Sequence, residues 1–111
     1  MSEAKSRVRL CGVDDIETGS MLQVSPPGLP ALAVYRIADG EFYCTQDLCT
    51  HERAYLSDGV VVDCVVECPF HQGRFHIPTG RPVAPPCTQP IRVWTACLVD
   101  GMVCIDPAEK F

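Results

Sequence analysis

Short apolar runs, each closed by polar turn residues, repeat along this chain and predict a β protein. The runs are rich in Val, Ile, Leu and Tyr, which favour the pleated surface of a sheet. Only Val13 to Glu17 invites a helical turn. The predicted strands are Val8–Cys11, Ser20–Val24, Leu32–Ile37, Glu41–Thr45, Val65–Cys68, Ile91–Ala96 and Met102–Ile105.

Turn dipeptides follow the runs at Asp39–Gly40, Asp58–Gly59, Thr79–Gly80 and Asp100–Gly101. The first and last of these predict tight two-residue hairpins. The chain also has 10 prolines, and proline breaks helices because it lacks a backbone N–H and its ring clashes with the preceding turn. The expected fold class is therefore antiparallel all-β.

Two short segments carry the candidate chemistry, each with one cysteine and one histidine. They are Cys49 with His51 and, after 16 intervening residues, Cys68 with His71. Two thiolates on one iron and two imidazoles on the other is the ligand set of a Rieske [2Fe–2S] cluster. Neutral imidazoles in place of thiolates remove negative charge, which makes such a cluster easier to reduce. The pattern predicts a one-electron carrier.

Two alternatives compete for these four residues. A structural zinc ion also takes two Cys and two His, but zinc modules usually group Cys with Cys and His with His. The four could also be ordinary core residues, although the chain has only three histidines and two of them fall in this pattern.

The segments CTHERAYLSDG (Cys49 to Gly59) and VVECPFHQGRFHIPTGRPVAPPC (Val65 to Cys87) are similar to the loops of Rieske-type ferredoxins. The similarity is strongest to ferredoxins that serve bacterial aromatic-ring-hydroxylating dioxygenases. It implies that Cys49 and Cys68 bind the inner iron, that His51 and His71 bind the outer iron, and that the proline loop covers one side of the cluster.

The resemblance also suggests how the chain is organised. We expect one Rieske domain, residues 1–111, in which about 1–44 and 88–111 form a β-sandwich or barrel base. Residues about 45–87 would form an inserted cluster-binding lobe. In the turn after Val62, Asp63 stands where the family often has glycine; aspartate tolerates the left-handed conformation better than most residues.

Two positions in the lobe predict a low reduction potential. High-potential respiratory Rieske proteins resemble one another in carrying a serine and a tyrosine whose hydroxyls donate hydrogen bonds to the cluster and to a cysteine sulfur. At the corresponding positions this chain has Gly73 and Phe75. Without these hydroxyls the added electron is less stabilised. The two extra loop cysteines of respiratory forms are absent too, which favours a ferredoxin over a quinol oxidase subunit.

The chain does not carry a second reaction centre of its own. A non-haem oxygenase site needs two further histidines and a carboxylate, but only His76 remains, and we expect it to be a structural histidine. No Gly-rich dinucleotide fingerprint follows a strand. The protein is predicted not to be an enzyme.

The resemblance implies a flavoprotein ferredoxin reductase, dependent on NAD(P)H, upstream and a terminal Rieske oxygenase with mononuclear iron downstream. The alternative is a Rieske subunit fixed within a larger oxidoreductase. A length of 111 residues suits one domain, and we expect a monomer.

Composition excludes other partners. A net charge of −5 with a pI near 5.0 argues against nucleic acid. No apolar run approaches the ~20 residues of a membrane span, and the first ten residues do not form a secretory signal. A cytoplasmic location is expected. The acidic residues near the predicted loops suggest either a solvated surface or a docking surface; they are Asp47, Glu52, Asp58 and Glu67.

The chain has eight cysteines, of which six lie outside the predicted ligand set. Reducing cytosol disfavours disulfides, so these six are expected to be free thiols. The hairpin at Asp100–Gly101 places Cys97 opposite Cys104, and a disulfide directly across two strands is geometrically demanding.

Overall fold

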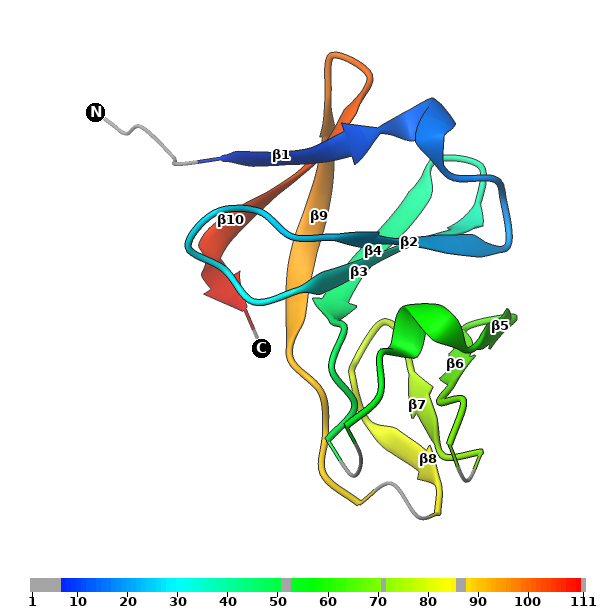
Figure 1. Ribbon diagram of the computed structural model, residues 1–111. Coiled ribbons are helices and arrows are strands. Elements are labelled where there is room, and N and C mark those ends of the chain that lie inside the picture. Colours follow the sequence, from blue (N-terminus) through cyan, green and yellow to red (C-terminus); the bar gives the residue numbers. More distant parts are fainter. Residues whose placement is uncertain (1–6, 51–52, 71, 86–87, 111) are drawn as a thin grey trace.

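Two antiparallel sheets make up the fold in a computed structural model that describes residues 7–50, 53–70, 72–85 and 88–110, the last four of these for the backbone alone. Figure 1 shows the four-stranded sheet lying beside one end of the six-stranded sheet. The six-stranded sheet has the order β1 (Val8–Gly12), β10 (Met102–Lys110), β9 (Val93–Val99), β4 (Glu41–Gln46), β3 (Leu32–Ala38) and β2 (Ser20–Val24). The four-stranded sheet has the order β5 (Val60–Val62), β6 (Val65–Glu67), β7 (Arg74–His76) and β8 (Pro82–Ala84). Two short 3₁₀ turns, η1 (Val13–Asp15) and η2 (Leu56–Asp58), complete the described elements.

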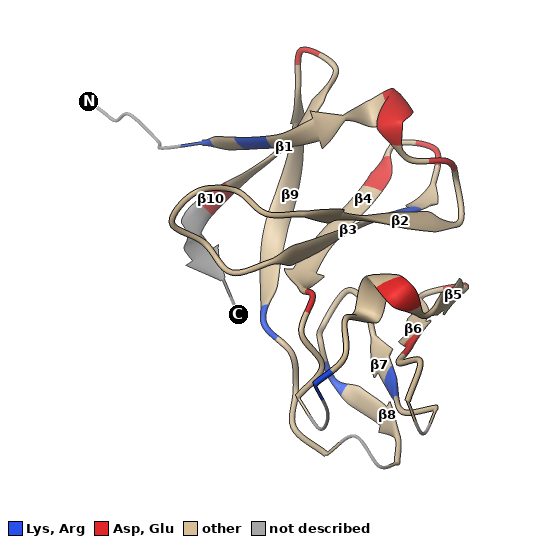
Figure 2. Ribbon diagram, in the orientation of Figure 1, with Lys and Arg blue, Asp and Glu red and all other residues tan. Residues whose placement is uncertain are grey.

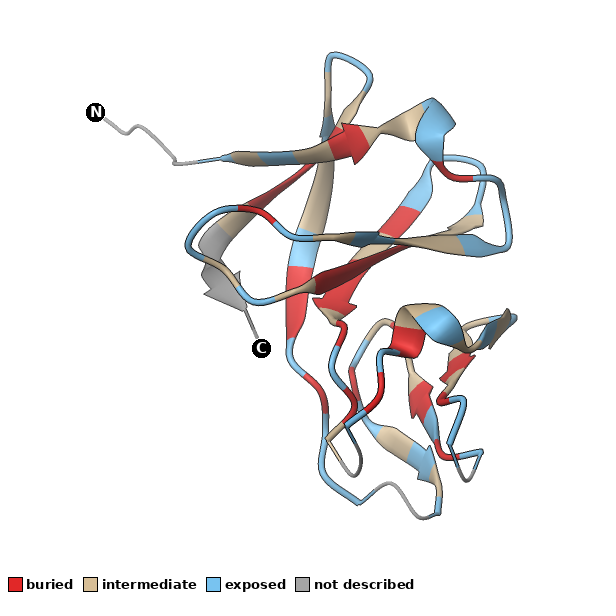
Figure 3. Cartoon of the chain, viewed as in Figure 1, coloured by how far each residue is buried: buried red, intermediate tan, exposed pale blue. Residues whose placement is uncertain are grey.

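Strand β3 is buried on both faces and separates two hydrophobic cores. Leu32 and Val34 point into a core inside the six-stranded sheet, whereas Ala33 and Tyr35 point into a core between the two sheets. Because successive side chains of a strand alternate between faces, a strand in this position needs a continuous apolar run. Figure 3 shows the first part of β3, Leu32 to Tyr35, as buried.

We call these cores the body core and the junction core. The body core contains Cys11, Ile16, Leu32, Val34, Phe42, Cys44, Trp94, Val103 and Ile105. The junction core contains Ala33, Tyr35, Cys49, Ala54, Leu56, Val66, Cys68, Phe75, Ile77 and Ile91.

The sequence predictions for the six-stranded sheet are largely confirmed. The strand predicted at Ser20–Val24 has those bounds, and β1, β3 and β4 extend one residue beyond their predictions. Strand β9 lies two to three residues later than predicted, and β10 continues to Lys110. All the strand pairs described are antiparallel, as expected.

The four-stranded sheet was predicted less well. Strand β6 was expected, but β5, β8 and η2 were not. Each of these elements has only three residues, which is too short for a periodic pattern to be recognised.

Three predicted turn features are confirmed by the backbone. Asp100 and Gly101 have φ of 52° and 77°, as a type I′ hairpin turn requires. Asp63, between β5 and β6, has φ of 55° and so adopts the left-handed conformation that the family often fills with glycine. Gly40 has φ of 74° in the hairpin between β3 and β4.

The hairpin of β9 and β10 places Cys97 opposite Cys104, as predicted. The two thiols are not joined: Cys97 Sγ donates to the carbonyl oxygen of Cys104 at 3.5 Å. Within the described residues, no helix is long and apolar enough to cross a membrane.

Candidate metal centre

The first loop of the candidate centre follows β4 and folds back on itself around Cys49. The Cys49 N–H donates to the carbonyl of Ala54 at 2.8 Å, and Leu48 forms an isolated bridge with Tyr55. Gln46 Nε2 donates to the carbonyl of Leu48 at 2.7 Å. These bonds fix the backbone at Cys49 and just before it, and the residue is only 4% exposed.

The second loop joins β6 to β7 and has the same kind of closure. Glu67 pairs with Arg74, and beyond this pair the Cys68 N–H donates to the carbonyl of Gly73 at 2.7 Å. Gln72 turns the chain with φ of 57°. Cys68 is 1% exposed, so this hairpin also directs its thiol inward.

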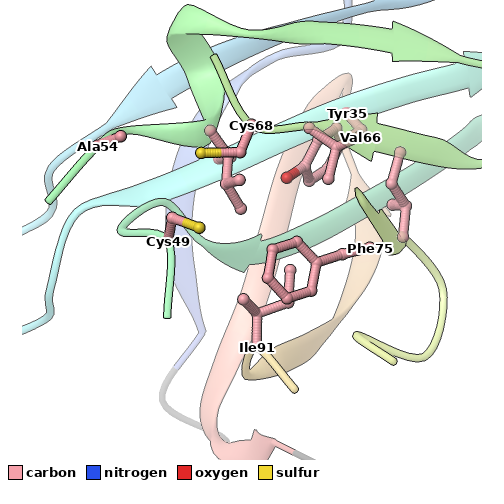
Figure 4. Close-up of a cluster of buried hydrophobic side chains, with 10 residues drawn as sticks. Tyr35, Cys49, Ala54, Val66, Cys68, Phe75 and Ile91 are labelled. Carbon is pink, nitrogen blue, oxygen red and sulfur yellow. The ribbon is translucent and has the colours of Figure 1, made fainter. Parts of the chain in front are cut away.

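Both thiols belong to the junction core. Figure 4 shows the sulfur atoms of Cys49 and Cys68 facing the same region of that core, with the Phe75 ring and Ile91 nearby. Two loops about twenty residues apart in sequence thus each place one cysteine in the junction core.

A third segment, the chain between β8 and β9, is tied to the first loop and to the turn between β7 and β8. Thr50 Oγ1 donates to the carbonyl of Gln89 at 2.8 Å, which connects this segment to the first loop. The Ile91 N–H donates to the carbonyl of Gly80 at 3.0 Å. This segment includes part of the predicted proline loop, of which Pro86 and Cys87 lie outside the described residues.

Two glycines allow the close packing of the four-stranded sheet. Gly80 has φ of +76°, and a Cβ at this position would overlap the carbonyl oxygen of Ile91. At Gly59, which follows η2, a Cβ would overlap the carbonyl oxygen of Glu67. Neither position accepts a side chain without movement of the backbone.

The two predicted histidine ligands, His51 and His71, lie outside the described residues. His76 is described, and it has the structural role predicted for it. Its Nδ1 is 2.9 Å from Thr79 Oγ1, in the turn that joins β7 to β8.

Asp47 is the residue near the centre that sequence reasoning placed wrongly. It was counted among acidic groups at the surface, but it is 0% exposed. Its carboxylate accepts hydrogen bonds from Gln23 Nε2, from the Ser57 N–H and from Ser57 Oγ, each at 2.7 Å. An aspartate two residues before a predicted ligand gives no sequence signal that separates a buried carboxylate from an exposed one.

The other acidic groups do not form a surface of one sign. Asp58 is exposed, Glu67 is partly buried with its carboxylate 3.9 Å from Arg74 Nε, and Glu52 lies outside the described residues. Figure 2 shows basic and acidic segments together on the four-stranded sheet.

Cysteines of the six-stranded sheet differ in character from a ligand. Burial raises the pKa of the Cys44 thiol to about 12, and burial also raises the pKa of Cys11 and Cys104. A thiol with a raised pKa is a poor nucleophile and a poor metal ligand, because both roles need the thiolate. These three cysteines act as small apolar residues, as expected.

The residues present fit the inner half of a Rieske cluster. Cys49 and Cys68 offer two thiols from facing loops, screened from water, which is what one iron of such a cluster requires. No three Cys, His, Asp or Glu side chains come together as a ligand set in the part of the chain that the structure describes. That part does not include the two histidines.

The family model for the Rieske [2Fe-2S] domain matches residues 6–95. The chain is 40% identical over 103 residues to ferredoxin CarAc of Metapseudomonas resinovorans, covering 93% of this chain and 95% of the relative. It is 43% identical over 100 residues to the ferredoxin component of the p-cumate 2,3-dioxygenase system of Pseudomonas putida, covering 89% and 84%.

A solved structure with a similar fold is the complex of reduced oxygenase and oxidized ferredoxin in carbazole 1,9a-dioxygenase. One of its chains superposes with a TM-score of 0.88 at 38% identity, covering 97% of this chain and 99% of that chain.

The chain therefore belongs to the Rieske [2Fe-2S] domain family. Its cofactor is a Rieske-type [2Fe–2S] cluster, which rules out the zinc alternative. Within that family it is an electron-transfer component, not a catalytic enzyme, as predicted.

Proposed function

We propose that this protein is a diffusible one-electron carrier. It would accept electrons from an NAD(P)H-dependent flavoprotein reductase and deliver them to a terminal Rieske non-haem iron oxygenase that acts on an aromatic compound. The observation that carries the proposal is the burial of Cys49 and Cys68 in one core, in a chain whose relatives are named as ferredoxin components of dioxygenase systems.

We further propose that Cys49, His51, Cys68 and His71 are the cluster ligands. Both cysteines are held by loop-closing backbone hydrogen bonds, and each histidine lies two or three residues beyond its cysteine. In this arrangement the cluster-binding lobe would comprise residues about 45–87, and residues about 1–44 and 88–111 would be the base. When bound, the cluster supplies reversible one-electron chemistry. The chain's part is to hold it, exclude water from the thiolate side and set its potential.

A free carrier is favoured over a subunit fixed in a larger oxidoreductase. This chain spans 95% and 84% of two relatives, one named as a ferredoxin and the other as the ferredoxin component of a dioxygenase system. We propose that the protein acts as a monomer in the cytoplasm. Gel filtration of the native protein should give the mass of one chain, and co-elution with a large complex would contradict this.

The proposed low potential is supported by what surrounds the thiols. Phe75 is fully buried in the junction core with Cys49 and Cys68, and it brings a ring without a hydroxyl. Gly73 offers the second loop no side chain at all. Donors to sulfur stabilise the reduced cluster, so Gly73→Ser combined with Phe75→Tyr should raise the reduction potential, as measured by protein-film voltammetry. Thr95→Ser, at an exposed position in β9, is a control for substitution away from the cluster, and an equal potential in the wild type, the double variant and the control would contradict the argument.

The function is tested by reconstitution. Purified protein is mixed with a flavoprotein ferredoxin reductase, NADH, and a terminal oxygenase of a relative's system such as that for p-cumate. We expect oxygenase turnover that requires this protein and saturates with its concentration. Turnover of equal rate without it would end the proposal.

A further inference from the structure

The buried carboxylate of Asp47 has no part in the proposed ligand set, and yet it accepts three hydrogen bonds, more than any other described side chain beside the first loop. It is fully buried, and a buried charge is costly unless it is hydrogen-bonded. Its position is fixed by the backbone as well: the Asp47 N–H donates to the carbonyl of Ala31 at 3.0 Å, and its carbonyl accepts from the Leu56 N–H at 2.7 Å.

Asp47 joins three parts of the molecule at one point. Gln23 comes from β2 in the six-stranded sheet, Ser57 from η2 at the entry to the four-stranded sheet, and Asp47 itself from the chain between β4 and Cys49. The carboxylate therefore fixes the first loop against both sheets just before its cysteine.

The hydrogen bonds around the carboxylate indicate its charge. Three groups donate hydrogen bonds to the carboxylate: an amide NH₂, a backbone N–H and a hydroxyl. The backbone N–H and the amide NH₂ can only donate, and an ionised carboxylate only accepts. These donors match an ionised carboxylate.

We propose that Asp47 is a positioning residue whose buried negative charge also lowers the reduction potential of the cluster. This inference rests on the proposed function, because it takes Cys49 as a ligand. The Cα atoms of Asp47 and Cys49, two residues apart, are separated by at most about 7 Å, and the buried carboxylate has little water to screen its charge. An added electron is repelled by a fixed negative charge.

The donors around Asp47 act in the opposite direction. Each one partly neutralises the carboxylate, so removing a donor while keeping the charge should lower the potential further. If Asp47 had a purely structural role, removing its charge and removing one of its donors would both loosen the loop. Both changes would then shift the reduction potential in the same direction.

The experiment measures the reduction potential of the holoprotein by voltammetry, together with its thermal midpoint. Asp47→Asn preserves the shape and removes the charge, and we expect the equilibrium constant for reduction to rise by about tenfold, which is about 59 mV for one electron. Asp58→Asn is the matched control, since it removes the same charge from an exposed position nearby, and we expect less than about a twofold change there because water and salt screen it.

Ser57→Ala tests the second expectation, a lower reduction potential on loss of a donor. It can still be measured if Asp47→Asn does not fold. It removes the hydroxyl donor from Asp47 and leaves the charge, so the equilibrium constant for reduction should fall. No change, or a rise, would overturn the inference. So would an Asp47→Asn potential equal to that of the wild type.

The two levels of the argument fail separately. Wild-type protein without the visible absorption of an iron–sulfur cluster would overturn the proposed function, and this inference with it. A cluster that is present but whose potential does not respond to Asp47→Asn would overturn this inference alone.

Discussion

The six-stranded sheet is built from strands of five to nine residues, whereas every strand of the four-stranded sheet has three. The longer strands surround the body core. This core consists of aliphatic, aromatic and thiol side chains from five strands, together with Ile16, which follows η1. The short strands cover the junction core, which contains both candidate ligand cysteines.

This difference indicates two sources of stability. Strands of ordinary length with a buried face can form a stable sheet from hydrophobic burial alone. Three-residue strands bury little, and the loops that connect them must be fixed in another way. Here the fixing elements are the loop-closing hydrogen bonds, two glycines at close contacts and, in our account, the bound cluster, whose binding energy adds to folding energy.

The largest expected effect is on the four-stranded sheet. Cys49→Ser or Cys68→Ser should abolish cluster incorporation and leave the loops of that sheet open to protease, while the six-stranded sheet keeps its protection. Iron content, visible absorption and hydrogen exchange measure the two outcomes. Cys97→Ser is the control: its thiol is half-buried in the six-stranded sheet, and full cluster content is expected. Loss of the cluster in the control would remove the distinction between the two regions.

Alkaline pH should act on the six-stranded sheet in part through Cys44. Its pKa is raised by burial from 9.0 to about 12, so above pH 9 the unfolded chain loses this proton and the folded chain keeps it. The contribution is therefore fully present below about pH 9 and declines as pH rises toward 12, by up to about 4 kcal/mol. Denaturant titrations between pH 8 and 11 measure the slope, which should be shallower in Cys44→Ala. Equal slopes in the two proteins would show that this thiol is not responsible.

A glycine substitution in the four-stranded sheet should lower the free energy of unfolding more than one in the six-stranded sheet. The difference should be smaller than the effects above. Gly80→Ala places a Cβ against the Ile91 carbonyl in a left-handed conformation, and we expect a loss of more than about 2 kcal/mol in the free energy of unfolding. Gly40→Ala has the same backbone conformation but open space around the Cβ, so about 1 kcal/mol is expected. Chemical denaturation of the holoprotein measures both. Equal losses would mean that the close contact at Gly80 relaxes freely.

The smallest expected effect concerns Tyr35, which lies in the strand shared by the two cores. Its buried hydroxyl is 2.8 Å from Thr45 Oγ1, so Tyr35→Phe should cost about 1 kcal/mol. Tyr43→Phe removes only a long, exposed hydrogen bond of 3.4 Å to Glu41, and a change within about 0.5 kcal/mol is expected. Thermal unfolding distinguishes the two variants, and a larger loss for Tyr43→Phe would contradict the assignment of burial.

The same contrast explains what could be predicted from the sequence. The strands of the six-stranded sheet were found because their apolar runs are long enough to show a pattern and end in recognisable turns such as Asp100–Gly101. The turn at Thr79–Gly80 was predicted. The close contact of Gly80 with the Ile91 carbonyl was not, because it depends on tertiary packing that no local sequence pattern contains.

The candidate site shows the same limit. The two Cys/His segments were recognisable because their chemistry requires those residue types at that spacing. Asp47 was misplaced because the donors that make its burial possible, Gln23 and Ser57, are 24 and 10 residues away in sequence. A buried polar network assembled from distant segments leaves no trace in composition or periodicity.

The central claim is that one cysteine and one histidine from each of two loops hold an asymmetric cluster. The most direct test is pulsed electron paramagnetic resonance on the reduced protein with ¹⁵N-labelled histidine, compared with its His76→Gln variant. We predict couplings from two imidazole nitrogens bound to the cluster, unchanged in His76→Gln because His76 is bonded to Thr79. A spectrum without nitrogen coupling, or one that loses a coupling in His76→Gln, would contradict the account.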